Sequence, residues 1–265
     1  MLLCLVSLRD LCCRQFDCEN FVVAEYAKLP LITPYLHPAY RQYTDGANFA
    51  SAGAGALVGT FQGSVVDLHA QLRYFKNLIG LLRQKLGDAH ATTLLGRAVY
   101  LFSIGTNDYI APYASSRRGL LSHSREEYVD MVIGNLTIVI KEIHKNGGMK
   151  FGFQSLPPLG YLPSPRALNL IAVTEELTAS CCCNLRREEF KEGKIACCGT
   201  GPYRGIYSCG AKRFVKKYEL CDNPREYVFF DSGHPTQMAN EQFAKLMWSG
   251  TLKDTGPYSL KMFEL

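Results

Sequence analysis

Residues 99–108 read VYLFSIGTND, an apolar run that stops at a glycine and continues in polar residues. A short run rich in β-branched and aromatic residues, bounded by glycine, predicts a buried strand over 99–104. Gly105 permits a backbone conformation that other residues avoid, so the chain can turn sharply there. The stretch therefore predicts a strand with Asn107 just beyond its carboxyl end.

Helical patterns stand on both sides of this strand. Before it, apolar residues recur in steps of three and four and predict one helix face: Leu68, Leu72, Phe75, Ile79, Leu82 and Leu86. After it, Ser124 and Glu127 have capping-box spacing, and a second helix face precedes Gly147: Val129, Val132, Leu136, Val139 and Ile143. Apolar runs at 149–153 and 227–230 predict further strands, and Pro235 predicts the start of a last helix.

This alternation of short apolar strands and helices predicts an α/β fold, a parallel sheet covered by helices on both faces. The 265 residues are 47% hydrophobic and contain no linker or repeat, so we expect a single domain over 1–265. Ligands of such sheets bind at the carboxyl ends of the strands. The residues that follow each predicted strand are therefore the candidate site.

Three groups at these strand ends suit acyl transfer. Gly53 lies in a small-residue stretch that leaves backbone N–H groups available, and Asn107 carries a side-chain amide, so both are candidate oxyanion donors. Asp231 can accept from His234 Nδ1–H and fix the tautomer, which leaves Nε2 to act as a base. Taken singly, however, Gly53 and Asn107 are also common turn residues, and an Asp three residues before a His arises by chance. Spacing alone leaves both interpretations open.

Longer stretches around these residues resemble a known family. GANFASAGAG (46–55), FSIGTNDY (102–109) and VFFDSGHPTQMAN (228–240) resemble three sequence blocks of the plant-type GDSL esterase/lipases of the SGNH hydrolase superfamily. Supporting stretches are EYAKLPLITPYL (25–36), VVDLHAQLRYFKNL (65–78), ACCGTGPYRGIYSCG (196–210) and YELCDNP (218–224). The resemblance covers most of the chain from about Glu25 onward.

The resemblance implies a three-layer α/β/α sandwich around a parallel, flavodoxin-like sheet. It implies hydrolysis of carboxylic esters, acyl lipids among them, by Ser-His-Asp chemistry without a metal or organic cofactor. By motif position, Gly53 and Asn107 would be oxyanion donors, His234 the base and Asp231 its partner. Secretion is implied as well, with disulfides in the region of 196–221.

The chain departs from the family pattern in two places. No Gly-Asp-Ser-Leu string occurs, and the best remnant is Ser7 in LVSLRD (5–10), within a degraded first block over 1–20. The stretch over 161–190 is also shorter than the family's, so one or two strands are expected to be missing. Loss of two segments in a gene model or splice form is one account of both departures.

Three functions therefore remain open. The chain is an ester hydrolase with Ser7 or another local serine as its nucleophile, a catalytically inactive SGNH-like protein that binds an acyl or glycan ligand, or a truncated product without a stable function. We expect a small ester or acyl-lipid substrate, while the sequence does not indicate an oligomeric state.

The composition of the chain indicates which compartment and which kinds of partner are expected. The chain has 11 cysteines, and no two have the C-x-x-C spacing of zinc ribbons; adjacent cysteines in glycine-rich sequence favour disulfides and an oxidising compartment. The net charge is +5, and the basic stretch over 212–217 reads as a solvated loop rather than a nucleic-acid site. MLLCLVSL (1–8) is a poor signal peptide, and no apolar run reaches the roughly 20 residues of a membrane span.

Overall fold

The computed structural model describes residues 2–6, 23–30, 32–38, 42–114, 123–156, 159–168, 190–206, 209 and 217–263. Ser7, the basic residues over 212–216 and most of the shortened stretch over 161–190 lie outside these residues. The chain divides into two compact units. The first comprises 1–11, 24–154 and 260–265, and the second comprises 12–23 and 155–259.

The first unit is built on a four-stranded parallel sheet in the order β2-β1-β3-β4. These strands are β1 (Leu2–Val6), β2 (Gly46–Asn48), β3 (Val99–Ser103) and β4 (Lys150–Phe153). Strand β1 lies between β2 and β3, with Val6 opposite Ser103. The expected parallel α/β sheet is confirmed, and the N-terminal apolar run forms one of its inner strands.

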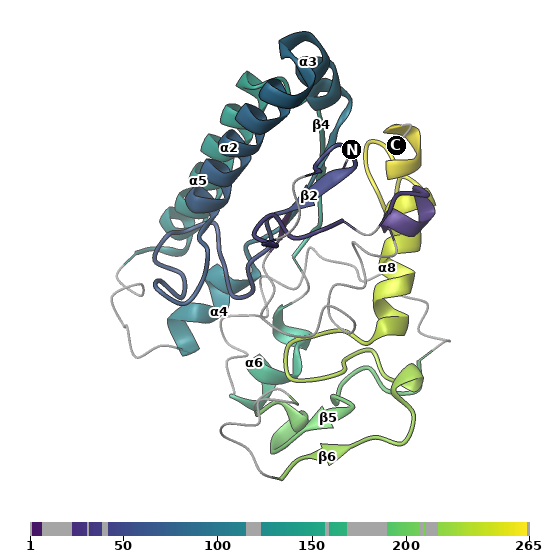
Figure 1. Cartoon of the computed structure of the whole chain (residues 1–265). Coiled ribbons are helices and arrows are strands. Elements are labelled where there is room, and N and C mark those ends of the chain that lie inside the picture. Colours follow the sequence, from purple (N-terminus) through teal and green to yellow (C-terminus); the bar gives the residue numbers. More distant parts are fainter. Residues whose placement is uncertain are drawn as a thin grey trace. The chain divides into compact units, whose positions relative to one another are not determined.

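The first unit has helices over both predicted apolar patterns, and it has shorter helices that the sequence did not predict (Figure 1). They are α2 (Leu68–Leu86), α3 (Asp88–Arg97), α4 (Thr106–Ala114) and α5 (Arg125–Lys145). Helix α5 begins with the capping box, in which Ser124 and Glu127 satisfy each other's backbone N–H groups. Helices α2 and α5 lie side by side in Figure 1, joined by a Lys76–Glu142 ion pair of 2.5 Å.

The core of the first unit is aromatic where β3 meets α2. Tyr100 and Phe102 on β3 are buried, and the ring of Phe75 on α2 meets that of Tyr100 edge-on at 5.7 Å between centroids. The Tyr100 hydroxyl donates to the carbonyl of Leu95, so its buried polar atom has a partner. The sequence periodicity of α2 is thus explained by one buried face.

The second unit has little regular structure among its described residues. It contains α6 (Pro163–Ala167), α8 (Gln237–Ser249) and the strands β5 (Cys198–Gly199) and β6 (Glu219–Leu220). The short 3₁₀ helices are η2 (Leu159–Tyr161), η4 (Pro202–Arg204) and η5 (Pro224–Glu226), while η6 (Leu260–Phe263) belongs to the first unit. Two disulfides, Cys197–Cys221 and Cys198–Cys209, confirm that this region is disulfide-bonded, and they give the pairing that the sequence left open.

Two local predictions for this unit were wrong. Residues 227–230 form isolated bridges instead of a strand, Tyr227 with Glu192 and Phe229 with Pro235. The reason is that their backbone bonds go to nearby loops: Val228 N–H donates to Glu192 O, and Thr236 N–H donates to Val228 O. The last helix begins at Gln237 instead of Pro235, because Thr236 caps it by accepting from Ala239 N–H.

Adjacent leucines of α2 test the packing of the first unit. Leu82 is 2% exposed and Leu81 is 40% exposed. We expect Leu82→Ala to lower the free energy of unfolding by about 2–5 kcal/mol, because it leaves a cavity in the core. Leu81→Ala is the matched control and should cost about 1 kcal/mol or less. Urea unfolding followed by circular dichroism measures both, and equal losses would contradict this packing.

Candidate active site

Asp231 and His234 form a short, well-aligned pair in the second unit. His234 Nδ1 lies 2.6 Å from Asp231 Oδ1. The same carboxylate oxygen accepts from the backbone N–H groups of Gly233 and His234, each at 3.0 Å. Three donors thus converge on one oxygen of a carboxylate that is only 1% exposed. The expected hydrogen bond between Asp231 and the Nδ1 edge of His234 is present.

The backbone around this pair closes into a tight turn. Phe230 N–H donates to His234 O at 2.8 Å, and Thr236 Oγ1 donates to Tyr227 O at 2.7 Å. Ser164 at the start of α6 donates its N–H to Ser232 O. The His234 side chain is 38% exposed, whereas its carboxylate partner is buried. The imidazole is therefore oriented on its Nδ1 edge and still partly open to solvent.

The Asp231 carboxylate stabilises the protonated form of the His234 imidazole. Burial opposes the charged form of His234 and lowers its pKa, but the hydrogen bond and the negative charge of Asp231 outweigh burial. The pKa of His234 consequently lies above its ordinary value of 6.5. A base of this kind loses its proton, and becomes able to accept one, only above that raised pKa.

Gly53 and Asn107 lie in the first unit, where the structure links their loops. Gly53 follows β2 and has a φ of 84°, inside a turn closed by Ala54 N–H to Ser51 O at 3.0 Å. Asn107 lies in the first turn of α4, after Gly105 with a φ of 118°. Asn107 Nδ2 donates to Ala54 O at 3.1 Å. The amide of one candidate donor thus contacts the residue next to the other.

A buried carboxylate that the sequence reasoning missed joins the same two loops. Asp108 is fully buried and accepts from Ala56 N–H at 2.7 Å, Leu57 N–H at 3.0 Å and Thr60 Oγ1 at 2.6 Å. Burial raises the pKa of the Asp108 carboxyl, although these hydrogen bonds act in the opposite direction. An acidic residue is common in the first turn of a helix, so the sequence gives no sign of these hydrogen bonds. Their partners precede Asp108 in the chain by 48 to 52 positions, and only the structure shows them.

Ser7, the proposed nucleophile, comes directly after strand β1 in the sequence. Strand β1 ends at Val6 between β2 and β3, and Ser7 is the next residue of the chain. Gly53 and Asn107 follow the two strands that flank β1. Ser7 itself lies outside the described residues. Its role as a nucleophile, like the oxyanion role of Gly53 and Asn107, stays a prediction.

The sequence of the chain matches a known protein family. Residues 14–247 match the family described as GDSL-like Lipase/Acylhydrolase. The chain belongs to this family. The matched residues include Gly53, Asn107, Asp231 and His234, and they begin after Ser7.

Plant members of the family are similar over most of this chain. It is 42% identical to "GDSL esterase/lipase 1" of Arabidopsis thaliana, over 92% of this chain and 76% of that protein. It is 41% identical to "GDSL lipase" of Tanacetum cinerariifolium, over 91% of this chain and 73% of that protein. It is also 29% identical to "Inactive GDSL esterase/lipase-like protein 25" of Arabidopsis thaliana, over 90% of this chain and 62% of that protein.

The alignment with GDSL esterase/lipase 1 shows that this GDSL family member lacks some segments that the relative has. The match to GDSL esterase/lipase 1 extends over 285 positions, which is more than the 265 residues of the whole chain. That relative therefore has residues with no counterpart here. This agrees with the expectation of shortened segments.

Close packing of Asp108 against Gly55 makes a sharp test of the first-unit loops. A Cβ added at Gly55 would lie 2.2 Å from Asp108 Oδ1, whereas one added at Gly59 would meet nothing within 4 Å. We expect Gly55→Ala to lower the free energy of unfolding by about 3 kcal/mol, because it displaces a buried, hydrogen-bonded carboxylate. Gly59→Ala is the control and should cost about 1 kcal/mol or less. Thermal unfolding compares the two, and a harmless Gly55→Ala would contradict the packing.

Proposed function

We propose that this protein is a carboxylic ester hydrolase that acts on small esters or acyl lipids by Ser-His-Asp chemistry. The observation that carries the proposal is the 2.6 Å contact between His234 Nδ1 and the buried Asp231 carboxylate. A carboxylate in this position holds the imidazole in one tautomer and stabilises the imidazolium that forms during catalysis. Family membership supplies the reaction class, since the family is described as lipase/acylhydrolase.

In the proposed reaction, His234 Nε2 takes the proton of the Ser7 hydroxyl as Ser7 Oγ attacks the ester carbonyl carbon. The carbonyl π electrons move to oxygen and form a tetrahedral oxyanion. Its collapse breaks the bond to the alcohol, which takes the proton back from Nε2 and leaves an acyl-serine. Water then attacks the acyl carbon and loses a proton to Nε2. The bond to Ser7 Oγ breaks, Oγ takes that proton from Nε2, and the carboxylic acid is released.

Gly53 N–H and Asn107 Nδ2–H are the proposed donors to the oxyanion. The contact of Asn107 Nδ2 with Ala54 O supports this role, because it sets the orientation of the amide relative to the Gly53 loop. Asp108 supports it further by binding Ala56 N–H and Leu57 N–H, which fixes that loop beyond Gly53. No metal or organic cofactor has a part in this chemistry.

The finer features of the fold and location belong to the same proposal. We propose one SGNH-type domain over residues 1–265, a three-layer α/β/α sandwich with one or two family strands missing. The two disulfides among the described residues support folding in an oxidising compartment and hence secretion. Among the helices that the structure describes, none has the length and apolar character needed to cross a bilayer. In that part of the chain no cluster of His, Cys, Asp or Glu is suited to a metal ion.

A second candidate function is ligand binding without catalysis. It is favoured by the family match, which starts at residue 14 and so does not include Ser7. One relative at 29% identity is itself named inactive. A protein of this kind would retain an acyl or glycan ligand but would not turn over an ester. Its ligand binding would survive His234→Ala, whereas hydrolysis requires the His234 base.

A fluorophosphonate probe tests the nucleophile. The proposal predicts that the probe labels the parent protein and that Ser7→Ala abolishes labelling, because only an activated serine reacts. Ser249→Ala, an exposed serine at the end of α8, is the control and should be labelled like the parent. Mass spectrometry of the labelled peptide identifies the residue. Labelling that persists in Ser7→Ala would exclude Ser7 and direct attention to another serine.

The pH profile tests the base. Since His234 must be neutral to accept a proton and its pKa is raised, kcat/KM for a short p-nitrophenyl ester should rise with pH about a midpoint above 6.5. Asp231→Asn should lower kcat by about 10³–10⁴-fold and shift that midpoint downward, because it removes the charge that raises the pKa. His234→Ala is the companion variant. A parent with no turnover at any pH would favour the binding function instead.

A further inference from the structure

Two adjacent cysteines of the second unit are each cross-linked to a different segment. Cys197 is joined to Cys221 and Cys198 to Cys209, at sequence separations of 24 and 11. Both Cys197 and Cys198 are buried. Strand β5, which begins at Cys198, and its partner β6 have only two residues each. A two-stranded pairing this short does not hold itself together, so the cross-links supply what regular structure does not.

The backbone of this cysteine pair is bonded to the segment that leads into Asp231. Cys197 N–H donates to Phe229 O at 2.9 Å, and Cys198 N–H donates to Phe230 O at 2.7 Å. Phe230 N–H in turn donates to His234 O at 2.8 Å. Phe230 therefore links the two backbones: its carbonyl accepts from Cys198 N–H, and its own N–H donates to the His234 carbonyl. Asp231 is the residue after Phe230.

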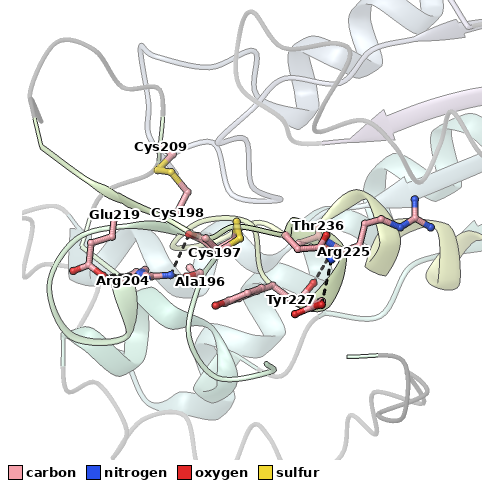
Figure 2. Close-up of a disulfide and its surroundings, with 12 residues drawn as sticks. Ala196, Cys197, Cys198, Arg204, Cys209, Glu219, Arg225, Tyr227 and Thr236 are labelled. Carbon is pink, nitrogen blue, oxygen red and sulfur yellow. Dashed lines mark hydrogen bonds and ion pairs between the residues drawn. A yellow bond between two sulfur atoms is a disulfide. The ribbon is translucent and has the colours of Figure 1, made fainter. Parts of the chain in front are cut away.

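Further contacts hold the cysteine pair on its other side. Cys221 N–H donates to Cys197 O at 2.7 Å, across the same pair of segments that the disulfide joins. Arg204 Nη1 donates to the carbonyls of Ala196 and Cys197, and its guanidinium pairs with Glu219 at 2.9 Å (Figure 2). The 196–198 segment is thus held by disulfides and by Arg204, and the N–H groups of Cys197 and Cys198 donate to residues 229 and 230.

We propose that Cys197 and Cys198 are positioning residues for catalysis: their disulfides hold the 196–198 backbone so that it orients the Asp231–His234 pair. This inference rests on the proposed function, in which His234 is the base. The alignment needed is strict, because a hydrogen bond weakens steeply when its donor turns away from the acceptor. We expect movement of the Phe229 and Phe230 carbonyls to displace the Asp231 carboxylate relative to His234 Nδ1, because Asp231 directly follows Phe230 in the chain.

NMR titration of the His234 imidazole tests this directly and does not require turnover. The double variants Cys198→Ser/Cys209→Ser and Cys197→Ser/Cys221→Ser each remove one bridge without leaving a lone thiol from it. We expect both to move the His234 titration midpoint downward toward 6.5, because the raising contact with Asp231 weakens. We also expect kcat for a short p-nitrophenyl ester to fall about tenfold with KM within about twofold, since an oriented base acts in the transition state.

Lys191→Met is the matched control. It removes the Lys191–Glu226 ion pair in the same unit and leaves the cysteine pair untouched, so the midpoint and kcat should stay as in the parent. If a double variant does not fold, the parent protein is titrated before and after reduction with a dithiol. Each disulfide then gains two electrons and two protons and becomes two thiols, while the dithiol is oxidised to its own disulfide.

The outcomes separate the two proposals. An unchanged His234 midpoint after loss of both bridges would overturn the positioning role, whether or not the protein hydrolyses esters. A lowered midpoint without ester turnover in the parent would support the positioning role and contradict the proposed hydrolase. A lowered midpoint with reduced kcat and unchanged KM supports both.

Discussion

The pairing of β3 on both of its sides is the constraint from which the first unit follows. Residues Val99 to Phe102 are buried, and a buried backbone must have its N–H and C=O groups hydrogen-bonded. Strand β1 meets this need on one side of β3 and β4 on the other. An N-terminal run of five residues that looks weak by itself is therefore an inner strand. The same parallel arrangement brings the loops that follow β2 and β3 to one edge of the sheet.

Hydrogen bonding then decides how the loops at that edge are held. The Asp108 carboxylate is buried at the start of α4 and accepts from three groups of the loop that follows β2. A buried carboxylate is tolerated only with such partners, so the loop packs closely against Asp108. Because of this close approach, a side chain at Gly55 would collide with the carboxylate. The neighbouring Asn107 contacts Ala54 O in the same arrangement. The loop that contains Gly53 is consequently bonded to both Asn107 and Asp108.

In the second unit, disulfides hold the loops in place, because helices and strands are few among its described residues. Its Asp231–His234 pair is local, three positions apart, and is closed by backbone bonds within residues 227–236. The cysteine segment at 196–198 binds the outside of that turn. A short turn with one buried acceptor and an external covalent support can be well ordered without a regular sheet of its own.

The sequence by itself determined the features that depend on near neighbours in the chain. Apolar spacing specifies α2 and α5, the Ser124–Glu127 box specifies where α5 starts, and the Asp-Ser-Gly-His order of 231–234 allows the carboxylate to reach the imidazole. The tertiary structure alone decided what depends on distant partners. It showed Asp108 bound to residues some fifty positions away, residues 227–230 in bridges and not in a strand, and the pairing of Cys197 with Cys221. The physical reason is that periodicity and spacing record which face of an element is apolar, whereas a hydrogen-bond or disulfide partner is chosen by the path of the folded chain.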